Sequence, residues 1–313
     1  MTIALGIGLF VIGAILAIFA TERLLEGLVG LSKILRLSAF VVGAILSGFE
    51  AENVAVGLAA GGQGVAAVAL GTVFGGAIFL VCVALGIGAL FFPLEIKLPR
   101  SVLLIFAGSP PLVGIGLISP VTPRWSGAVL LVAFVAAMFY LVRVSRRQQV
   151  LEAAGEVKEA QEKQRPLWMV IGLTLFGITV ISIGGEFVAQ GAEQIIAGLG
   201  VPALFMGMIV SPAAIEIEEV FRQAIPSKEG RHDVSAGNLI GTLLYFLLFN
   251  LGLIVLLTPV KVDPLVLRLD WPFLVAVTLL ATLFLWRGRV GRLAGALLLT
   301  AYAVYIALHL LYH

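Results

Sequence analysis

The feature that most constrains this chain is a series of about ten apolar stretches, each long enough to cross a lipid bilayer as a helix. A spanning helix needs roughly 20 mostly apolar residues. Composition agrees, because 60% of the 313 residues are hydrophobic and only 12% are charged. We therefore predict an all-α membrane protein. The predicted spans lie near residues 3–22, 38–59, 64–91, 101–119, 125–144, 167–187, 201–222, 234–258, 269–286 and 292–311.

Lys and Arg are divided unevenly between the two sets of loops that ten spans would create. Of the 20 basic residues, 17 fall in one set, and the other holds only Arg124, Lys261 and Arg268. Cytoplasmic loops of membrane proteins collect Lys and Arg. The bias predicts a multi-pass protein of the cell membrane with both termini outside and the central loop in the cytoplasm. The net charge of +2 requires no nucleic-acid partner, so the expected partners are the lipid bilayer and small cations, and the oligomeric state stays open.

A long polar stretch, residues 145–166, divides five predicted spans from five others. We interpret it as a cytoplasmic linker between a first five-helix repeat, residues 1–144, and a second, residues 167–313. An offset of 166 residues places Glu50 on Glu216 and Glu52 on Glu218, and just upstream the offset is 164. Because each half has an odd number of spans, the halves must cross the membrane in opposite senses. This is the inverted-repeat architecture of secondary transporters.

Five glutamates lie inside the second and seventh predicted spans: Glu50, Glu52, Glu216, Glu218 and Glu219. An ionisable residue at bilayer depth is costly and by default marks an ion or proton path. Its occurrence at equivalent places in both halves strengthens that interpretation. The sequence therefore predicts an ion site where the two spans meet.

Residues that interrupt helices accompany both acidic clusters. Ser47-Gly48 precedes the first cluster and Ser211-Pro212 the second. Gly is conformationally loose, and Pro removes a hydrogen-bond donor and clashes with the preceding turn, so we predict broken second and seventh helices. Carbonyls freed at such breaks would add oxygen ligands. Ca²⁺ takes six to eight oxygens from carboxylates, carbonyls and water.

Two similar motifs, ATERLLEG and GGEFVAQG, belong to the first and sixth spans, and the second half also contains GNLIG at 237–241. With them the chain resembles the cation/calcium exchanger superfamily, which contains sodium/calcium and proton/calcium exchangers. In that family each half has a broken helix bearing an essential Glu, 18 residues before a Gly-Asn-x-x-Gly-Ser segment. Here Glu219 stands 18 residues before Gly237. The segment PAAIEIEE at 212–219 is similar to the Pro-x-x-Gly-Asn-Ala-x-Glu of the proton-coupled branch.

The resemblance implies a set of cation ligands. In the second half Glu216 takes the place of the family's Asn, and in the first half the Glu and Asn positions fall on Asn53 and Glu50. Residues i and i+3 share a helix face, so each pair can point at one site. The implied metal ligands are Glu50, Asn53, Glu216 and Glu219.

Four further residues are ranked below these ligands as candidate site residues. Glu52 and Glu218 would point elsewhere, and Glu218 also has Arg222 four residues on, the spacing of an intrahelical ion pair. They could serve as a proton relay or as a vestibule charge. Asn238 and Thr242 would cap a helix or line the cavity, since small polar groups also join membrane helices.

The sequence also departs from the sodium-coupled members of the family. Where those carry Asn or Asp, this chain has Leu80 and Phe246, and where Ser is usual it has Gly76 and Thr242. We therefore predict that this chain lacks ligands of the sodium sites found in those members. Burial and like-charge neighbours raise the pKa of carboxylic acids in general, so that protons can compete with a cation near neutral pH.

We therefore predict a secondary active antiporter that exchanges Ca²⁺, or a related divalent cation, for protons by alternating access, with no cofactor and no enzymatic activity. A sodium/calcium exchanger is the main alternative. A passive channel and an intramembrane enzyme are the others, although no paired aspartates, Ser/His arrangement or Asp-rich magnesium motif stands out. The single cysteine, Cys82, lies within an apolar run and is interpreted as a core residue.

Overall fold

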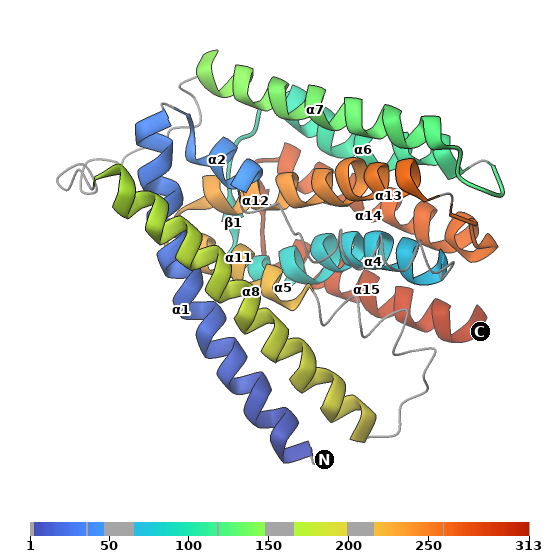
Figure 1. Cartoon of the computed structure of the whole chain (residues 1–313), viewed down its shortest axis with the longest axis horizontal. Helices are drawn as coiled ribbons and strands as arrows, with labels where there is room; N and C mark the ends of the chain where they lie inside the picture. The colour runs from blue at the N-terminus through green and yellow to red at the C-terminus, as the bar shows by residue number, and fades with distance from the viewer. Residues whose placement is uncertain are drawn as a thin grey trace.

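The computed structural model describes residues 3–35, 37–46, 66–117, 119–147, 166–198, 216–258 and 260–312, and it is mostly helical (Figure 1). The first half contains α1 (Ile3–Leu35), α2 (Ala39–Leu46), α4 (Ala66–Phe79), η1 (Leu80–Ala84), α5 (Leu85–Phe91), β1 (Leu94–Glu95), α6 (Arg100–Leu117) and α7 (Arg124–Arg147). The second contains α8 (Leu167–Gly198), α11 (Ile217–Lys228), α12 (His232–Leu244), η5 (Tyr245–Asn250), α13 (Leu251–Leu257), η6 (Val266–Asp270), α14 (Trp271–Trp286), β2 (Arg289–Val290) and α15 (Arg292–Tyr312). The elements η1, η5 and η6 are π-helical.

Among the described residues, seven helices are long and apolar enough to cross a membrane, or eight if α1 and α2, which meet at a bend of 115°, form one broken span. Each of the ten predicted spans includes at least part of a described helix. The predicted breaks at Ser47-Gly48 and Ser211-Pro212, and residues 148–165 of the linker, lie outside the described residues.

The first helix is longer than the first predicted span, because α1 continues past residue 22 to Leu35. Its second half carries a stripe of buried leucines, which pack with Val170 of α8 and Val234 of α12. Their spacing is that of one helix face, so tertiary packing extends the helix through a polar stretch. The leucines of this stripe are Leu24, Leu25, Leu28 and Leu31.

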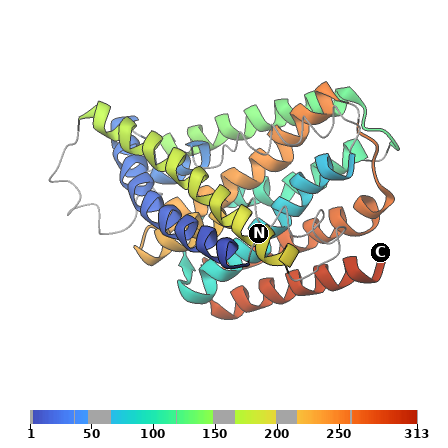
Figure 2. The ribbon, with the colours of Figure 1, turned by 60° about the horizontal axis from the view of Figure 1, so that its bottom comes forward.

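Helices α1 and α8 form a long pair along one flank of the molecule, side by side and running in opposite directions (Figures 1 and 2). Glycines bring their backbones together. A Cβ at Gly177 would lie 2.7 Å from the Cα of Leu24, and one at Gly27 would lie 2.7 Å from the backbone nitrogen of Thr174. Close approach through small residues is the usual way in which membrane helices associate.

Two central spans form the core of the bundle. One is α4–η1–α5 and the other is α12–η5–α13. In the apolar stretch of about 18 residues within each span, 89% is buried for Val73–Phe91 and 78% for His232–Leu257. The π-helices end at Ala84 and Asn250, which are 166 residues apart, as are the helix ends at Phe91 and Leu257. Cys82 is fully buried in this core, as predicted.

The outer helices pack on these two spans in matching ways. α15 contacts α5 and α7 contacts α13, while α6 packs against α14. α7 and α15 lie on opposite sides of the bundle and run in opposite directions (Figures 1 and 2). The short strands β1 and β2 pair antiparallel, and an isolated bridge joins Val121 to Lys261.

Helices α2 and α12 touch backbone to backbone. A Cβ added at Gly237 would overlap the carbonyl oxygen of Phe40, and one at Gly241 that of Ala44. Glycine is needed at both places because any side chain would push the helices apart. Asn238 follows Gly237 on α12 and is therefore buried deep in the bundle.

Candidate functional site

The seventh predicted span places three glutamates at the start of α11. Glu216 is the N-cap residue, and Glu218 and Glu219 are in the first turn. All three are buried, with exposed fractions of 1%, 4% and 0%. The N-terminus of a helix favours negative charge because its first N–H groups point outward along the helix dipole. Even so, carboxylates buried this deeply need polar or cationic neighbours.

Arg222 supplies a cation for two of these carboxylates. Its Nη2 lies 2.5 Å from Oε1 of Glu218, and its Nη1 lies 2.8 Å from Oε1 of Glu219. The arginine is itself only 4% exposed. The predicted ion pair between Glu218 and Arg222 is thus present, but it does not distinguish Glu218 from Glu219, because the guanidinium contacts both residues.

Glu219 is also held by the neighbouring helix. Nδ2 of Asn238 on α12 donates a hydrogen bond of 2.6 Å to its Oε2. Both carboxylate oxygens of Glu219 therefore have a partner, one from its own helix and one from α12. One turn further along α12, Thr242 is fully buried, and its hydroxyl has no hydrogen-bond partner among the described residues.

Glu216 reaches the other half of the molecule. A Cβ at Gly76 of α4 would lie 3.2 Å from Oε1 and 3.3 Å from Cδ of Glu216. The carboxylate thus rests on α4 at the position where the sodium-coupled members of the resembled family carry Ser. The glycine leaves the space that this larger acidic side chain fills.

A second polar layer continues from the glutamates towards the turn between α11 and α12. Oγ of Ser235 donates to Oε1 of Gln223 at 2.7 Å, and Oγ of Ser227 donates to Oγ of Ser235 at 3.1 Å. At the turn, Arg231 pairs with Asp233 at 3.1 Å. Sequence reasoning missed this layer, although all but Arg231 fall on the buried faces of α11 and α12.

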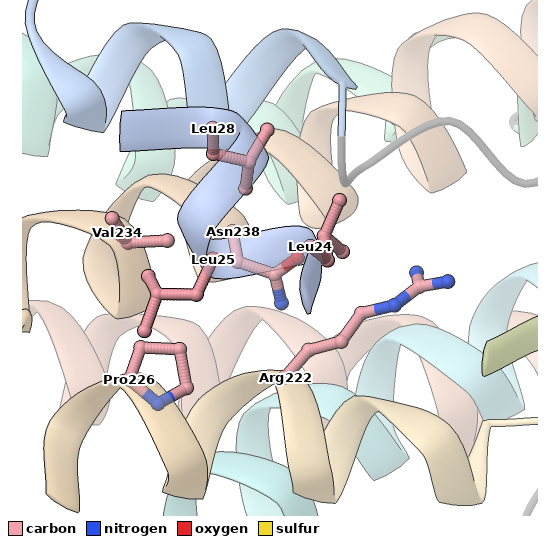
Figure 3. Close-up of a pocket in the computed structure, with 7 residues that line it drawn as sticks. All are labelled: Leu24, Leu25, Leu28, Arg222, Pro226, Val234 and Asn238. Atoms are coloured by element: carbon pink, nitrogen blue, oxygen red, sulfur yellow. The ribbon is translucent and has the colours of Figure 1, made fainter. Parts of the chain in front are cut away.

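A small pocket flanks the acidic cluster where α1 covers α11 and α12 (Figure 3). In Figure 3 the guanidinium of Arg222 points away from Leu25 and Pro226. The lining is mostly aliphatic, so the pocket is not itself suited to a hydrated cation. Its lining residues are Leu24, Leu25, Leu28, Arg222, Pro226, Val234 and Asn238.

A separate buried cluster joins η6 to α15, and the sequence analysis gave it no role although its members fall within predicted spans. Oδ1 of Asp270 accepts a hydrogen bond of 2.7 Å from the hydroxyl of Tyr305 and lies 2.7 Å from Nε2 of His309. All three side chains are nearly inaccessible. The cluster ties the start of the ninth predicted span to the end of the tenth.

The structure thus brings together four of the predicted site residues, Glu216, Glu218, Glu219 and Asn238, with Thr242 nearby on α12. The other three, Glu50, Glu52 and Asn53, lie outside the described residues. Within the part of the chain that is described, no group of three or more His, Cys, Asp and Glu side chains could hold a metal ion.

Similarity to known proteins covers both halves. The chain is similar to the inner membrane protein YrbG of Escherichia coli (strain K12), with 25% identity over 253 residues, 77% of this chain and 76% of that protein. It is also similar to a Ca(2+)/H(+) antiporter of Aphanothece halophytica, with 28% identity over 182 residues; this match covers 56% of the chain and 48% of the antiporter.

Solved structures of the sodium-calcium exchanger NCX_Mj share the fold. One superposes with a TM-score of 0.81 at 20% identity, covering 98% of this chain and 99% of the exchanger. A structure of NCX_Mj soaked without Na⁺ and Ca²⁺ gives a TM-score of 0.79. The family model described as sodium/calcium exchanger protein matches residues 5–143 and 169–311. With the buried glutamates and this match across both halves, the chain belongs to the sodium/calcium exchanger family.

Proposed function

We propose that this chain is a secondary active antiporter that exchanges Ca²⁺, or a related divalent cation, for protons by alternating access. The observation that carries the proposal is Glu219, a fully buried carboxylate held between Asn238 of α12 and Arg222 of α11. Protons and a metal cation compete for the same carboxylate oxygens. A site that holds either one, and reorients when loaded, is sufficient for exchange.

The proposed architecture is ten transmembrane helices in two inverted five-helix repeats, residues 1–144 and 167–313, with broken second and seventh helices. The opposite directions of α1 and α8, and of α7 and α15, support it. So do the π-helices that end 166 residues apart. In this arrangement the linker of residues 145–166 is cytoplasmic and both termini lie outside.

The proposed cation ligands are Glu50, Asn53, Glu216 and Glu219. The contact of the Glu216 carboxylate with Gly76 supports a site between the two repeats. Glu52, Glu218, Asn238 and Thr242 form the surroundings of the site rather than its first ligands. No cofactor is needed, because the ion and the protons are the transported species.

Coupling to protons is supported by the relatives whose names state it, the Ca(2+)/H(+) antiporters of Aphanothece halophytica and of Synechocystis sp. (strain ATCC 27184 / PCC 6803 / Kazusa). It is supported further by Leu80 and Phe246, which are apolar and buried where sodium-coupled members carry Asn or Asp. Exchange of sodium for calcium is the second candidate. Its support is the fold shared with the sodium-calcium exchanger NCX_Mj.

Ion flux in proteoliposomes tests the proposal. Ca²⁺ uptake driven by an imposed pH gradient is expected in wild type and should fall to the level of empty liposomes in Glu219→Gln, because an amide cannot offer the charge that a divalent cation requires. The matched control is Glu95→Gln, an exposed residue paired with Arg289 at 3.1 Å, which should transport normally.

The alternatives give different outcomes in the same liposomes. Uptake that needs a sodium gradient and ignores pH would identify a sodium/calcium exchanger. Uptake that proceeds with no opposing gradient of either ion would identify a channel. Equal uptake by Glu219→Gln and wild type would exclude Glu219 as the central ligand.

A further inference from the structure

Arg222 is an unexpected residue for a cation site. Its guanidinium carries a permanent charge, since arginine does not lose its proton in proteins. It is buried, and its Nη1 lies 2.8 Å from a carboxylate oxygen that we propose as a cation ligand. A fixed positive charge there repels any second cation, because Coulomb interactions are strong where water is excluded. The transported ion and Arg222 therefore compete for Glu219.

The geometry provides a way for both to be accommodated. Arg222 contacts Glu219 through Nη1 and Glu218 through Nη2, so it can give up the first contact and keep the second. Glu218 lies next to Glu219 on α11 and is also buried. Asn238 would continue to hold the second oxygen of Glu219 during the change.

We propose that Arg222 is a tethered competing cation: it occupies Glu219 while the site is empty and withdraws to Glu218 when the transported cation binds. This inference rests on the proposed function. It assigns to Glu218 the role of a holding carboxylate for the arginine. It also explains how Glu219 remains neutralised at 0% exposure when no ion is bound, because the charge that an ion would supply comes from the chain itself.

The competition lowers the affinity for the transported cation by a predictable amount. A hydrogen bond to a charged group contributes about 1.5–3 kcal/mol, which corresponds to a factor of roughly 10–100 in a dissociation constant. Arg222→Gln is therefore expected to bind Ca²⁺ about 10- to 100-fold more tightly than wild type. Glu218→Gln should bind it more weakly, because of the two carboxylates that contact Arg222 in the described part of the chain only Glu219 then keeps its charge.

The double variant Arg222→Gln/Glu218→Gln separates this mechanism from a simple structural role. It removes one charge of each sign, so the net charge of the buried cluster is unchanged and the fold is protected if Arg222→Gln alone proves unstable. Its affinity should match or exceed that of wild type, so that the loss caused by Glu218→Gln disappears once Arg222 is neutral. If Glu218 were a direct ligand, the loss would persist.

Calorimetric titration of the purified full-length protein with Ca²⁺ at one pH measures these affinities. Arg231→Gln is the matched control, because Arg231 also pairs with a nearby acid, at 3.1 Å, but lies at the turn between α11 and α12; its affinity should equal that of wild type. The inference would be overturned if the wild type binds Ca²⁺ and neither Arg222→Gln nor the double variant binds it more tightly than the wild type. That result would leave the proposed antiporter function intact. A wild type that neither binds nor transports Ca²⁺ would instead remove the proposed function, and this inference with it.

Discussion

At the scale of single residues, the position of Glu216 depends on the absence of a side chain at residue 76. The carboxylate lies against α4, where a Cβ would come within 3.2 Å of Oε1. That separation is shorter than ordinary carbon–oxygen contact, so a methyl group must move the carboxylate. The glycine thus sets where one proposed ligand stands.

Gly76→Ala is therefore expected to weaken Ca²⁺ binding by about tenfold, since crowding a packed site costs about 1–3 kcal/mol. Gly71→Ala is the matched control on the same helix, because no described atom lies within 4 Å of a Cβ there. Titration calorimetry compares the two variants. Equal affinities in both would mean that Glu216 is not a ligand.

The individual site residues were predictable to different extents. The motif spacing that selected Glu219 and the GNLIG segment agrees with the hydrogen bond between Asn238 and Glu219. The contact of Arg222 with both glutamates was not predictable. Residues three and four positions earlier both lie within its reach on one helix face, so the spacing does not say whether it contacts one of them or both. The contact between Glu216 and Gly76 depends on how two distant helices pack, which local spacing does not determine.

At the scale of helices, α2 and α12 lie so close that two glycines of α12 have no room for a Cβ. Gly237 and Gly241 face the backbone carbonyls of Phe40 and Ala44. Backbone atoms cannot rotate away as a side chain can. The pair must therefore separate if either glycine gains a Cβ.

Gly241→Ala is expected to destabilise the protein by about 1–3 kcal/mol or more, the usual range for overpacking a well-packed core. Gly108→Ala on α6 is the control, because a Cβ there meets no described atom within 4 Å. Thermal unfolding of the detergent-solubilised proteins, followed by loss of the monodisperse peak, compares them. A Gly241→Ala protein as stable as Gly108→Ala would show that α2 and α12 can separate at little cost.

Helix positions were largely predictable from hydropathy, but their ends were not. The first span was predicted to end near residue 22 because polar residues follow, yet leucines on one face carry α1 to Leu35. The π-helical segments η1 and η5 were not predicted at all. Most of their side chains, such as Leu80 and Phe246, are apolar like those of the α-helical turns on either side, so no residue type marks the change to i→i+5 hydrogen bonds.

At the scale of the whole molecule, the proposed topology follows from the distribution of basic residues and from helix pairs that run in opposite directions. The first is a property of the sequence, and the second of the fold (Figure 1). Membrane orientation itself depends on charges in the loops. It therefore needs a test that does not use the fold.

Cysteine labelling in intact cells provides that test. Cys82 is fully buried, so a cysteine introduced by Glu156→Cys in the linker should be the reactive one. It is expected to react with a membrane-impermeant maleimide only after the cells are opened. Lys261→Cys, at an exposed position of the opposite loop set, should react in intact cells; the reverse pattern would invert the proposed orientation.

The burial of the two central spans has a consequence for how the membrane acts on this protein. The outer helices are much less buried than these two spans: only 33% of the apolar stretch of α7 and 28% of that of α15 is buried. The outer helices therefore meet the acyl chains, and a thicker or thinner bilayer strains them first. The carboxylates on α11 are nearly inaccessible, so a change in bilayer thickness would act on them through the helices that pack against α11.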